Sequence, residues 1–306
     1  MLKVATHSGT FHADDVFAYA MLRAATAGRI ELTRTRDAGL LAAADVVFDV
    51  GGVFDRAARR YDHHMRDQPT RPAGEPFSSA GLVWRDFGAA AVRTLLPGAS
   101  PEAVATIAAK VDQGLIRDVD LMDNGAMAPA PGHVSTVIEA FNVTCAEDEG
   151  DETAAFLRAV EVAATVLTRV CAHAHAAALA ARTVAEAARA ARDPRILVLD
   201  HRVPWEDAVF DLGLDRALYV VRPAGDAWTC SAVPPQRGSF SQRLPLPEPW
   251  GGLRDAEFAE ATGVADATFC HPARFVCGAR SLDGAVALAA LAAGRGPDPL
   301  TRSEDR

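Results

Sequence analysis

The chain has 306 residues, of which 49% are hydrophobic and 23% are charged, and its formal net charge is −9. This mixture is typical of a globular protein with a substantial buried core, and it excludes disorder over most of the chain. The negative charge excludes a basic protein that coats duplex DNA, but it is compatible with a nucleic-acid enzyme whose carboxylates bind cations.

The chain lacks the usual marks of a secreted or membrane protein. The N-terminus reaches His7 without an apolar stretch, so we expect no signal peptide. The Ala-rich stretch over residues 154–192 is broken by Arg, His and Glu, so we expect no membrane span. The five cysteines form no Cys-x-x-Cys pair, which indicates reduced, mostly buried thiols. These features favour a cytoplasmic protein.

The first elements predict a βαβ unit. Residues 4–6 form a short strand that ends in the polar turn over residues 7–10, and a helix with an apolar face follows. Residues 45–50 are a continuous apolar run closed by two glycines, which suits a buried parallel strand. Ligands of parallel sheets bind at the carboxyl ends of the strands, where His7 and Asp49 lie.

Further along the chain, the pattern changes from helical to mixed. Helices are predicted over residues 79–87, 102–115, 133–141 and, within an Ala-rich region, 151–192. A strand over residues 195–200 follows the turn signal Asp193-Pro194, so we place a domain boundary at residue 192. Short strands then follow at residues 217–221, 228–233, 267–270 and 275–276. We therefore expect an α+β domain with a mostly antiparallel sheet over residues 193–295, and a flexible tail over 296–306.

Imidazoles and carboxylates gather in the first half of the chain. The triplet Asp62-His63-His64 is the most informative, although by itself it fits an exposed loop. The other histidines and aspartates in this half of the chain make a metal site the better interpretation. They are His7, His12, Asp14, Asp15, Asp49, Asp118, Asp120 and Asp123. Mixed imidazole and carboxylate ligation suits Mn²⁺, Fe²⁺ or Mg²⁺. No cysteine precedes Cys145, which excludes a Cys-ligated zinc site in this half.

Such a ligand set predicts hydrolysis by two metal ions. A carboxylate that bridges two cations roughly 3.5–4 Å apart would help to generate hydroxide and to neutralise a phosphoryl group. Asp49 is the candidate bridge, because it lies at a strand end between the other groups. His63 or His64 could polarise the phosphate or act as a general acid. Asp15 is equally well explained as a charge at the start of a helix.

Several motifs resemble the melanocyte-proliferating-gene family of DHH phosphoesterases. The similar segments are residues 6–15, 49–55, 60–64, 77–84, 239–250 and 252–255. The resemblance spans about residues 3–293, and the chain looks like a bacterial member of the family. It implies a DHH-type catalytic domain with a parallel sheet, a smaller α+β substrate-binding domain, and a cleft between the two. It also implies phosphodiester hydrolysis, since eukaryotic members are regarded as 3′→5′ RNA exonucleases.

The resemblance also implies which residues bind metal and substrate. The implied ligands are His7, His12, Asp14, Asp49, Asp62 or His63, and either Asp120 or Asp123, with Asp120 slightly preferred. The candidate substrate contacts are Arg243, Arg254, His271, Arg274 and Gly278. Two positions depart from the wider superfamily: His12 stands where its first motif has an Asp, and Cys277 replaces the first glycine of a Gly-Gly pair.

The leading hypothesis is a 3′→5′ exonuclease that acts on RNA or short oligonucleotides with two divalent ions, preferentially Mn²⁺. One alternative is a pyrophosphatase or small-nucleotide phosphatase that uses the same site. Another is a non-catalytic binding protein with a vestigial site, which is disfavoured because no expected ligand is replaced by an apolar residue. A homodimer is compatible with the sequence.

Overall fold

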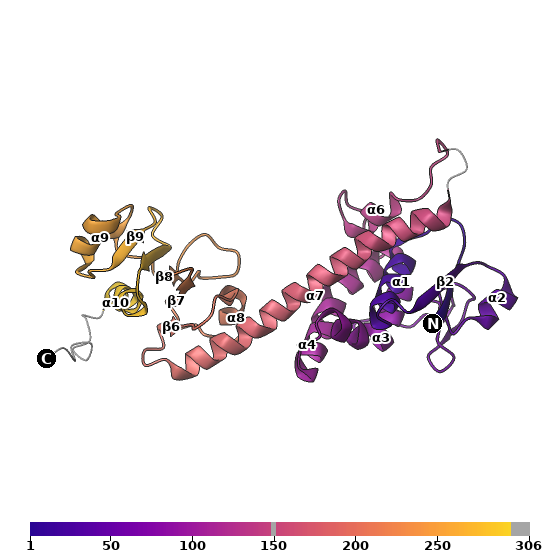
Figure 1. The fold of residues 1–306 in the computed structure, drawn as a ribbon, viewed down its shortest axis with the longest axis horizontal. Helices are drawn as coiled ribbons and strands as arrows, with labels where there is room; N and C mark the ends of the chain where they lie inside the picture. Colours follow the sequence, from indigo (N-terminus) through magenta and orange to yellow (C-terminus); the bar gives the residue numbers. More distant parts are fainter. Residues whose placement is uncertain (148–150, 295–306) are drawn as a thin grey trace. The chain divides into compact units, whose positions relative to one another are not determined.

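The computed structural model describes residues 1–147 and 151–294, and the chain divides into two compact units (Figure 1). The first unit covers residues 1–175 and the second begins at Ala176. The tail expected over residues 296–306 lies outside the described residues. Among the helices of the described ranges, none combines the length and the apolar character that crossing a membrane requires.

The first unit is built on a five-stranded, mostly parallel sheet with the strand order β2-β1-β3-β5-β4. Strands β2, β1, β3 and β5 run parallel to one another, and β4 is antiparallel to β5 at one edge. The strands are β1 (Leu2–Thr6), β2 (Ile30–Arg34), β3 (Val46–Phe48), β4 (Phe54–Asp55) and β5 (Arg60–Tyr61). The predicted α/β class with a parallel sheet is therefore confirmed.

The prediction of a βαβ unit missed one strand, which lies in the connection between β1 and β3. Between β1 and β3 lie helix α1 (Ala13–Ala25), strand β2 and helix α2 (Ala38–Ala43). Strand β2 lies at the sheet edge and alternates between half-buried and exposed residues. Its sequence Ile-Glu-Leu-Thr-Arg therefore lacks the continuous apolar run by which the buried strand β3 is recognised.

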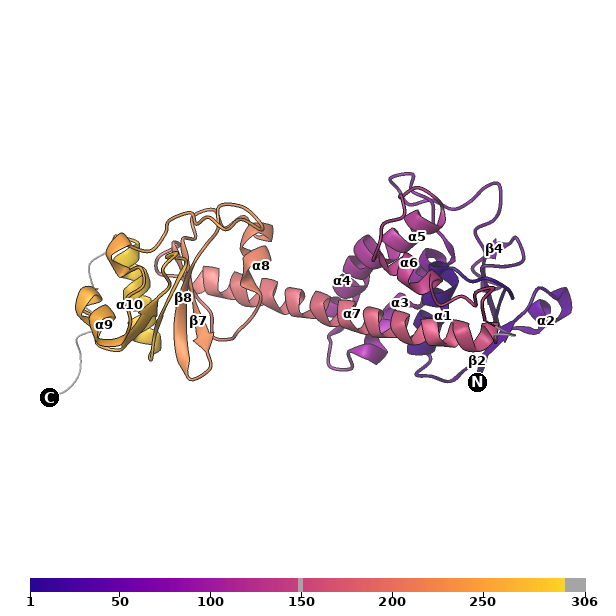
Figure 2. The same cartoon turned by 90° about the horizontal axis from the view of Figure 1, so that it is seen from above.

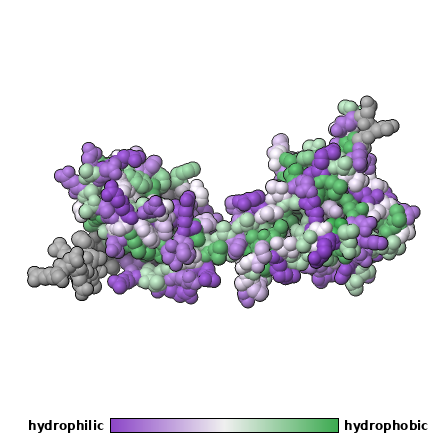
Figure 3. Space-filling view, viewed as in Figure 1, coloured by the Kyte–Doolittle hydropathy of each residue, from purple (hydrophilic) through white to green (hydrophobic). Residues whose placement is uncertain are grey.

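Helices bury one hydrophobic core against this sheet. They are α3 (Ser79–Leu95), α4 (Pro101–Val111), the π-helical turn η1 (Asp112–Ile116), α5 (Arg117–Asp123) and α6 (Val134–Glu139). Helix α1 packs closely on α3, with Phe17, Met21 and Leu82 almost fully buried. Burial of one such side chain stabilises the fold by roughly 1.5–3 kcal/mol. The outer surface is mixed, and Figure 3 shows hydrophilic and hydrophobic residues side by side on the visible face of each unit.

Helix α7 (Glu152–Ala190) is continuous and belongs to both units, as Figure 2 shows. Phe156 and Val160 near its start lie in the core of the first unit. Ala180 and Val184 near its end pack in a core of the second unit with Leu197. The division between the units therefore lies inside the helix, whereas the end of the helix at Ala190 lies close to residue 192, where the sequence places the boundary.

The second unit contains a five-stranded sheet with the order β6-β7-β8-β10-β9. Only β6 and β7 are parallel, and the other pairs are antiparallel. The strands are β6 (Ile196–Val198), β7 (Tyr219–Ala224), β8 (Ala227–Ala232), β9 (Ala267–Cys270) and β10 (Val276–Ala279). The helices are α8 (Trp205–Asp211), the 3-10 turn η2 (Glu248–Trp250), α9 (Asp255–Thr262) and α10 (Leu282–Ala292). This is the α+β pattern expected from the sequence.

Candidate metal centre

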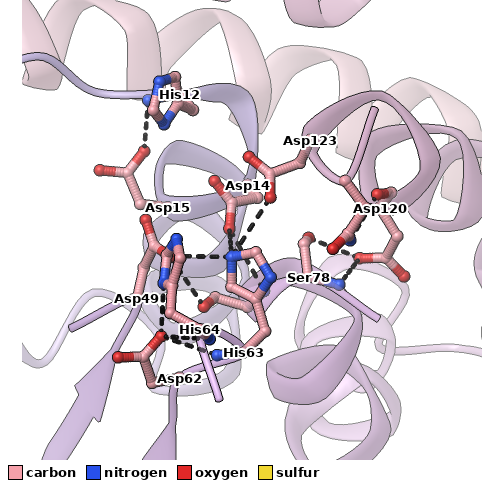
Figure 4. A network of polar contacts seen from close by, with 12 residues as sticks. His12, Asp14, Asp15, Asp49, Asp62, His63, His64, Ser78, Asp120 and Asp123 are labelled. Carbon is pink, nitrogen blue, oxygen red and sulfur yellow. Dashed lines mark hydrogen bonds and ion pairs between the residues drawn. The ribbon is translucent and has the colours of Figure 1, made fainter. Parts of the chain in front are cut away.

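The ends of three neighbouring strands bring the candidate ligands together (Figure 4). His7 directly follows β1, Asp49 directly follows β3, and the triplet Asp62-His63-His64 directly follows β5. Because these strands are adjacent and parallel, their carboxyl ends share one edge of the sheet. Segments up to 57 residues apart in the sequence, from His7 to His64, thereby meet at one place.

The start of helix α1 adds two buried carboxylates to this edge. His12 is the N-cap residue, and Asp14 and Asp15 lie in the first turn, where the helix dipole favours negative charge. The backbone N–H of His12 donates a hydrogen bond to Asp15 Oδ1 at 3.0 Å. Both carboxylates are fully buried, whereas His12 is exposed. The start of this helix therefore places two buried carboxylates beside the strand ends.

Asp49 occupies a strained position at the centre of the cluster. Its backbone φ is +55°, in the left-handed region that non-glycine residues rarely adopt and that costs about 1–3 kcal/mol. Its carboxylate oxygens lie 3.1 Å from His7 Nε2 and 3.3 Å from His63 Nε2. Burial alone would raise the pKa of Asp49, but hydrogen bonds with His63 and His7 outweigh it and hold this pKa well below its usual range.

Four overlapping sets of side chains each place their ligand atoms within 4.8 Å of one another. They are His7, Asp15 and Asp49; His12, Asp14 and Asp49; Asp49, His63 and His64; and Asp14, His63 and Asp123. Asp49 belongs to three of the sets, and Asp14 and His63 each belong to two. The overlap is the arrangement expected if one carboxylate serves two neighbouring cations.

The chemistry of the cluster fits a divalent cation. Asp14 Oδ1 is a buried atom without a hydrogen-bond partner among the described residues, and His63 Nε2 is surrounded by the carboxylates of Asp49 and Asp123. Burial, together with the charges of Asp49 and Asp123, raises the pKa of Asp14 well above its usual value. Burial opposes protonation of His7, but hydrogen bonds to Asp15 and Asp49 raise its pKa to about 10. The crowded carboxylates therefore favour a bound cation, and oxygen and imidazole groups are suitable ligands for a divalent metal ion.

Asp123 and Asp120 have different surroundings, although only one turn of α5 separates them. Asp123 Oδ2 lies 3.2 Å from His63 Nε2, within one of the ligand sets. Asp120 Oδ1 instead accepts hydrogen bonds from Ser78 Oγ at 2.6 Å and from Gly81 N at 2.9 Å. Its Oδ2 is 2.5 Å from Arg71 Nη1. The geometry therefore favours Asp123 as the ligand, the reverse of the slight preference drawn from the motif.

Asp62 organises the loop that carries the two histidines. Its Oδ1 accepts hydrogen bonds from the backbone N–H groups of His63 and His64 and lies 2.7 Å from His64 Nδ1. Its Oδ2 accepts a hydrogen bond from Gly52 N. Among the described residues, Asp62 enters none of the four ligand sets. Its contacts are those of a residue that positions ligands.

Three further residues of the site were missed or left open by the sequence reasoning. Asp15 belongs to a ligand set, which its position at a helix start did not reveal. Gln68 Nε2 lies 3.1 Å from His63 Nδ1 and also bonds to Phe77 O, so it fixes the imidazole ring. Arg36 lines the cavity beside the cluster, two residues after the unpredicted strand β2. If β2 had been recognised in the sequence, Arg36 would have been expected near the carboxyl ends of the strands, where the candidate ligands lie.

A cavity of about 500 Å³ opens beside the cluster. Its wall includes the turn over residues 7–10, His12, Arg36, Asp49 and His64. The His64 side chain is 62% exposed, whereas that of His63 is 6% exposed. Of the two histidines, His64 is therefore the one that a substrate can reach.

The predicted substrate contacts all lie in the second unit. Two of the arginines donate hydrogen bonds to backbone carbonyl oxygens of that unit. Arg243 Nη1 donates to the carbonyl oxygens of Leu214 and Ala217. Arg274 has a left-handed backbone with φ +57° and donates to Leu246 O at 3.2 Å. Arg254 is the exposed N-cap residue of α9.

His271 and Gly278 belong to the β9–β10 hairpin. The exposed ring of His271 lies 4.5 Å from that of Phe275. Gly278 is buried in β10, and a Cβ atom there would lie 2.7 Å from the ring of Phe269. Packing inside the sheet thus accounts for this glycine. Cys277 is buried as well, opposite Cys230 in the antiparallel ladder.

Comparisons with known proteins agree over nearly the whole chain. A family model described as MYG1_exonuc, Uncharacterised protein family (UPF0160), matches residues 3–293. The chain is 34% identical to the MYG1 protein C694.04c of Schizosaccharomyces pombe, over 94% of this chain and 96% of that protein. It is 35% identical to the MYG1 exonuclease of Homo sapiens, over 94% of this chain and 84% of that protein.

Among solved structures, RecJ of Thermus thermophilus in complex with Mg²⁺ is similar at 13% sequence identity and a TM-score of 0.28. The match covers 96% of this chain and 50% of RecJ, so this chain spans about half of that protein. The RecJ structure with Mn²⁺ gives the same TM-score. A score this low does not indicate a common arrangement over the aligned length.

Proposed function

We propose, from the premise that this chain belongs to the MYG1_exonuc family, that it hydrolyses phosphodiester bonds with the help of divalent metal ions. The family resemblance predicted from the motifs is confirmed by the match over residues 3–293. The expected enzyme class, a hydrolase of the exonuclease type, agrees with the relative from Homo sapiens, which is named an exonuclease.

One observation carries the proposal: four ligand sets overlap at the edge of a parallel sheet, three of them on Asp49, beside a cavity of about 500 Å³. A single His and Asp pair could hold one ion at most, whereas this cluster offers eight side chains. Two ions, with Asp49 between them, would use these groups most fully. Their oxygen and imidazole ligands suit Mn²⁺, with Mg²⁺ and Fe²⁺ as alternatives.

When bound, paired divalent cations would activate a water molecule and neutralise charge on the phosphoryl oxygens. The residues of the chain supply the remaining parts. His64 faces the cavity, and its Nδ1 lies 2.7 Å from Asp62, so its Nε2 remains available to give a proton to the leaving oxygen. Arg36 on the cavity wall would bind a neighbouring phosphate, which a planar guanidinium does with two parallel hydrogen bonds.

The finer parts of the proposal concern the substrate. We infer single-stranded RNA or short oligonucleotides degraded in the 3′→5′ direction, as the family resemblance implies. The cavity volume of about 500 Å³ is within the range of about 300–1,000 Å³ that is usual for small-molecule sites, so the end of a strand is a suitable occupant. This fits an enzyme that removes terminal residues one at a time.

The first test is cleavage of end-labelled single-stranded RNA by the purified full-length chain in Mn²⁺. We expect shortening from the 3′ end, and we expect Asp49→Asn to lower the rate at least 100-fold, because the shared carboxylate is lost. Asp226→Asn, an exposed carboxylate in the second unit, is the matched control and should keep the wild-type rate.

Two outcomes would contradict the proposal. Equal rates for the wild type and Asp49→Asn would remove Asp49 from the mechanism. Failure to cleave RNA, DNA, pyrophosphate or an activated phosphodiester in the presence of Mn²⁺, Mg²⁺ or Fe²⁺ would favour a non-catalytic role.

A further inference from the structure

The second unit contains a cavity that is separate from the metal centre. Its volume is about 570 Å³, and its lining consists of residues 202–207 and Arg222. Residues 202–207 lead from strand β6 into helix α8, and Arg222 lies on strand β7. Figure 2 shows α8 and β7 within the same unit, and Trp205 and Val220 pack in one core there. The walls of the cavity are therefore anchored to the sheet.

Arg222 has an incomplete set of interactions. Its Nε is buried and has no hydrogen-bond partner in the described structure. A buried donor on a charged group that lacks a partner destabilises the fold, because its hydration is lost without replacement. Burial and the nearby charge of Arg202 lower the pKa of Arg222, while Glu206 acts in the opposite direction. The side chain of Arg222 thus lines the cavity and keeps one donor without an acceptor among the described residues.

Arg202 is the second cation on the wall. It is exposed, and within residues 1–147 and 151–294 it forms no hydrogen bond or ion pair. Neighbouring arginines of this unit are engaged differently: Arg237 pairs with Asp207 and Asp211 on α8. Two guanidinium groups that line one cavity repel each other, and an anion between them would remove this repulsion.

The rest of the lining offers groups that a simple inorganic anion would not use, namely a hydrogen-bond acceptor and an apolar wall. Glu206 makes no hydrogen bond in the described part of the chain, and its carboxylate can only accept hydrogen bonds when ionised. Carboxylates bind ribose hydroxyl groups in this way in nucleotide sites. Val203, Pro204 and Trp205 form an apolar wall. The volume is within the usual range for a small-molecule site.

We propose that this cavity binds a ribonucleoside monophosphate. Arg202 and Arg222 hold the phosphate, Glu206 accepts a hydrogen bond from the ribose, and the base lies against the wall over residues 203–205. The same chemistry is offered by a free nucleotide and by the terminal nucleotide of an RNA strand. The site does not depend on the metal centre, since all of its residues belong to the second unit.

The test is calorimetric titration of the full-length chain with AMP in the presence of a chelator. We expect AMP to bind at least tenfold more tightly than adenosine, because adenosine lacks the phosphate. Arg202→Ala and Arg222→Ala should each weaken AMP binding at least tenfold. Because Arg202 is exposed, the first variant will fold even if the second does not. Glu206→Gln should weaken the binding of AMP more than that of dAMP.

Two controls separate this site from the rest of the molecule. Arg280→Ala removes an exposed arginine of the same unit and should leave AMP binding unchanged. Asp49→Asn, which alters the metal centre, should also leave it unchanged. Competition by a short RNA with a terminal phosphate would identify a strand end as the source of the ligand, and no competition would identify a free nucleotide. Wild-type affinity in both cavity arginine variants, or loss of binding only in Asp49→Asn, would overturn the proposal.

Discussion

Asp120 and Asp123 show how two carboxylates on one short helix acquire different tasks. Asp120 is fully buried and accepts hydrogen bonds from the start of α3 and from Arg71. Arg71 also pairs with Asp112 in the π-helical turn. Asp120 thereby holds α3, α5 and the Arg71 loop together, while Asp123 faces His63.

We therefore expect the two substitutions to separate stability from metal binding. Asp120→Ala should lower the free energy of unfolding by about 3–5 kcal/mol, because it leaves Arg71 and two backbone N–H groups buried without their acceptor. Asp123→Asn should leave the stability of the metal-free protein nearly unchanged or raise it, since it removes one of several crowded negative charges. It should weaken Mn²⁺ binding instead.

Urea denaturation of the metal-free protein and titration with Mn²⁺ measure these two effects. Asp118→Ala is the matched control for stability, because the Asp118 side chain is 43% exposed and should contribute less than about 1 kcal/mol. Similar losses of stability in the Asp120 and Asp118 variants would contradict the role of Asp120.

At the scale of single residues, much of the candidate metal site could be predicted from the sequence. His7, Asp49 and His63 follow strands or motifs that the sequence displays, and the structure brings both histidines within about hydrogen-bonding distance of Asp49. The choice between Asp120 and Asp123 could not be predicted, because it depends on where Arg71 lies after folding. The contact of Asp120 with Arg71 joins residues 49 positions apart in the chain.

At the scale of elements, the loop after β5 depends on one carboxylate. Strand β5 has only two residues, so its ladder gives the following histidines little support. Asp62 compensates for this by bonding to both histidine N–H groups and to Gly52 in the neighbouring loop. The loop is thus held by side-chain hydrogen bonds.

Asp62→Ala should therefore impair the site without removing a ligand. We expect a loss of about 10–100-fold in metal affinity or activity, which is typical when a residue that orients metal ligands is replaced. The measurement is the dependence of the cleavage rate on Mn²⁺ concentration. Asp67→Ala, an exposed change in the same segment, is the control. An unchanged profile for Asp62→Ala would show that the loop does not need this carboxylate.

The elements that could be predicted are those with long or continuous patterns. Helices α3 and α7 and strand β3 have such patterns and were expected. Strands β2, β4 and β5 were missed, because they are short or lie near a sheet edge, where alternation is weak. The predicted helix over residues 102–115 changes at Asp112 into the π-helical turn η1, a local deviation that the helical pattern of the sequence does not reveal.

At the scale of the whole molecule, metal binding should stabilise the first unit. A ligand that binds only the folded state adds RT ln(1 + [L]/Kd), or about 2.7 kcal/mol at 100 times Kd. We expect Mn²⁺ to raise the melting temperature of the full-length chain, and a chelator to reverse the effect. Asp49→Asn should abolish the rise, because three of the four ligand sets include Asp49. Differential scanning calorimetry measures this, and an identical rise in the variant would contradict it.

The continuity of α7 limits how the protein can be cut into pieces. A fragment that begins at residue 193 would omit Ala180 and Val184, which fill the core around Leu197 and Trp205. A fragment that ends at residue 175 would leave the helix truncated in the middle, with several unbonded carbonyl groups at its new end. Fragments made to study either half should therefore overlap along this helix, so that each half keeps the helical turns that close its own interior.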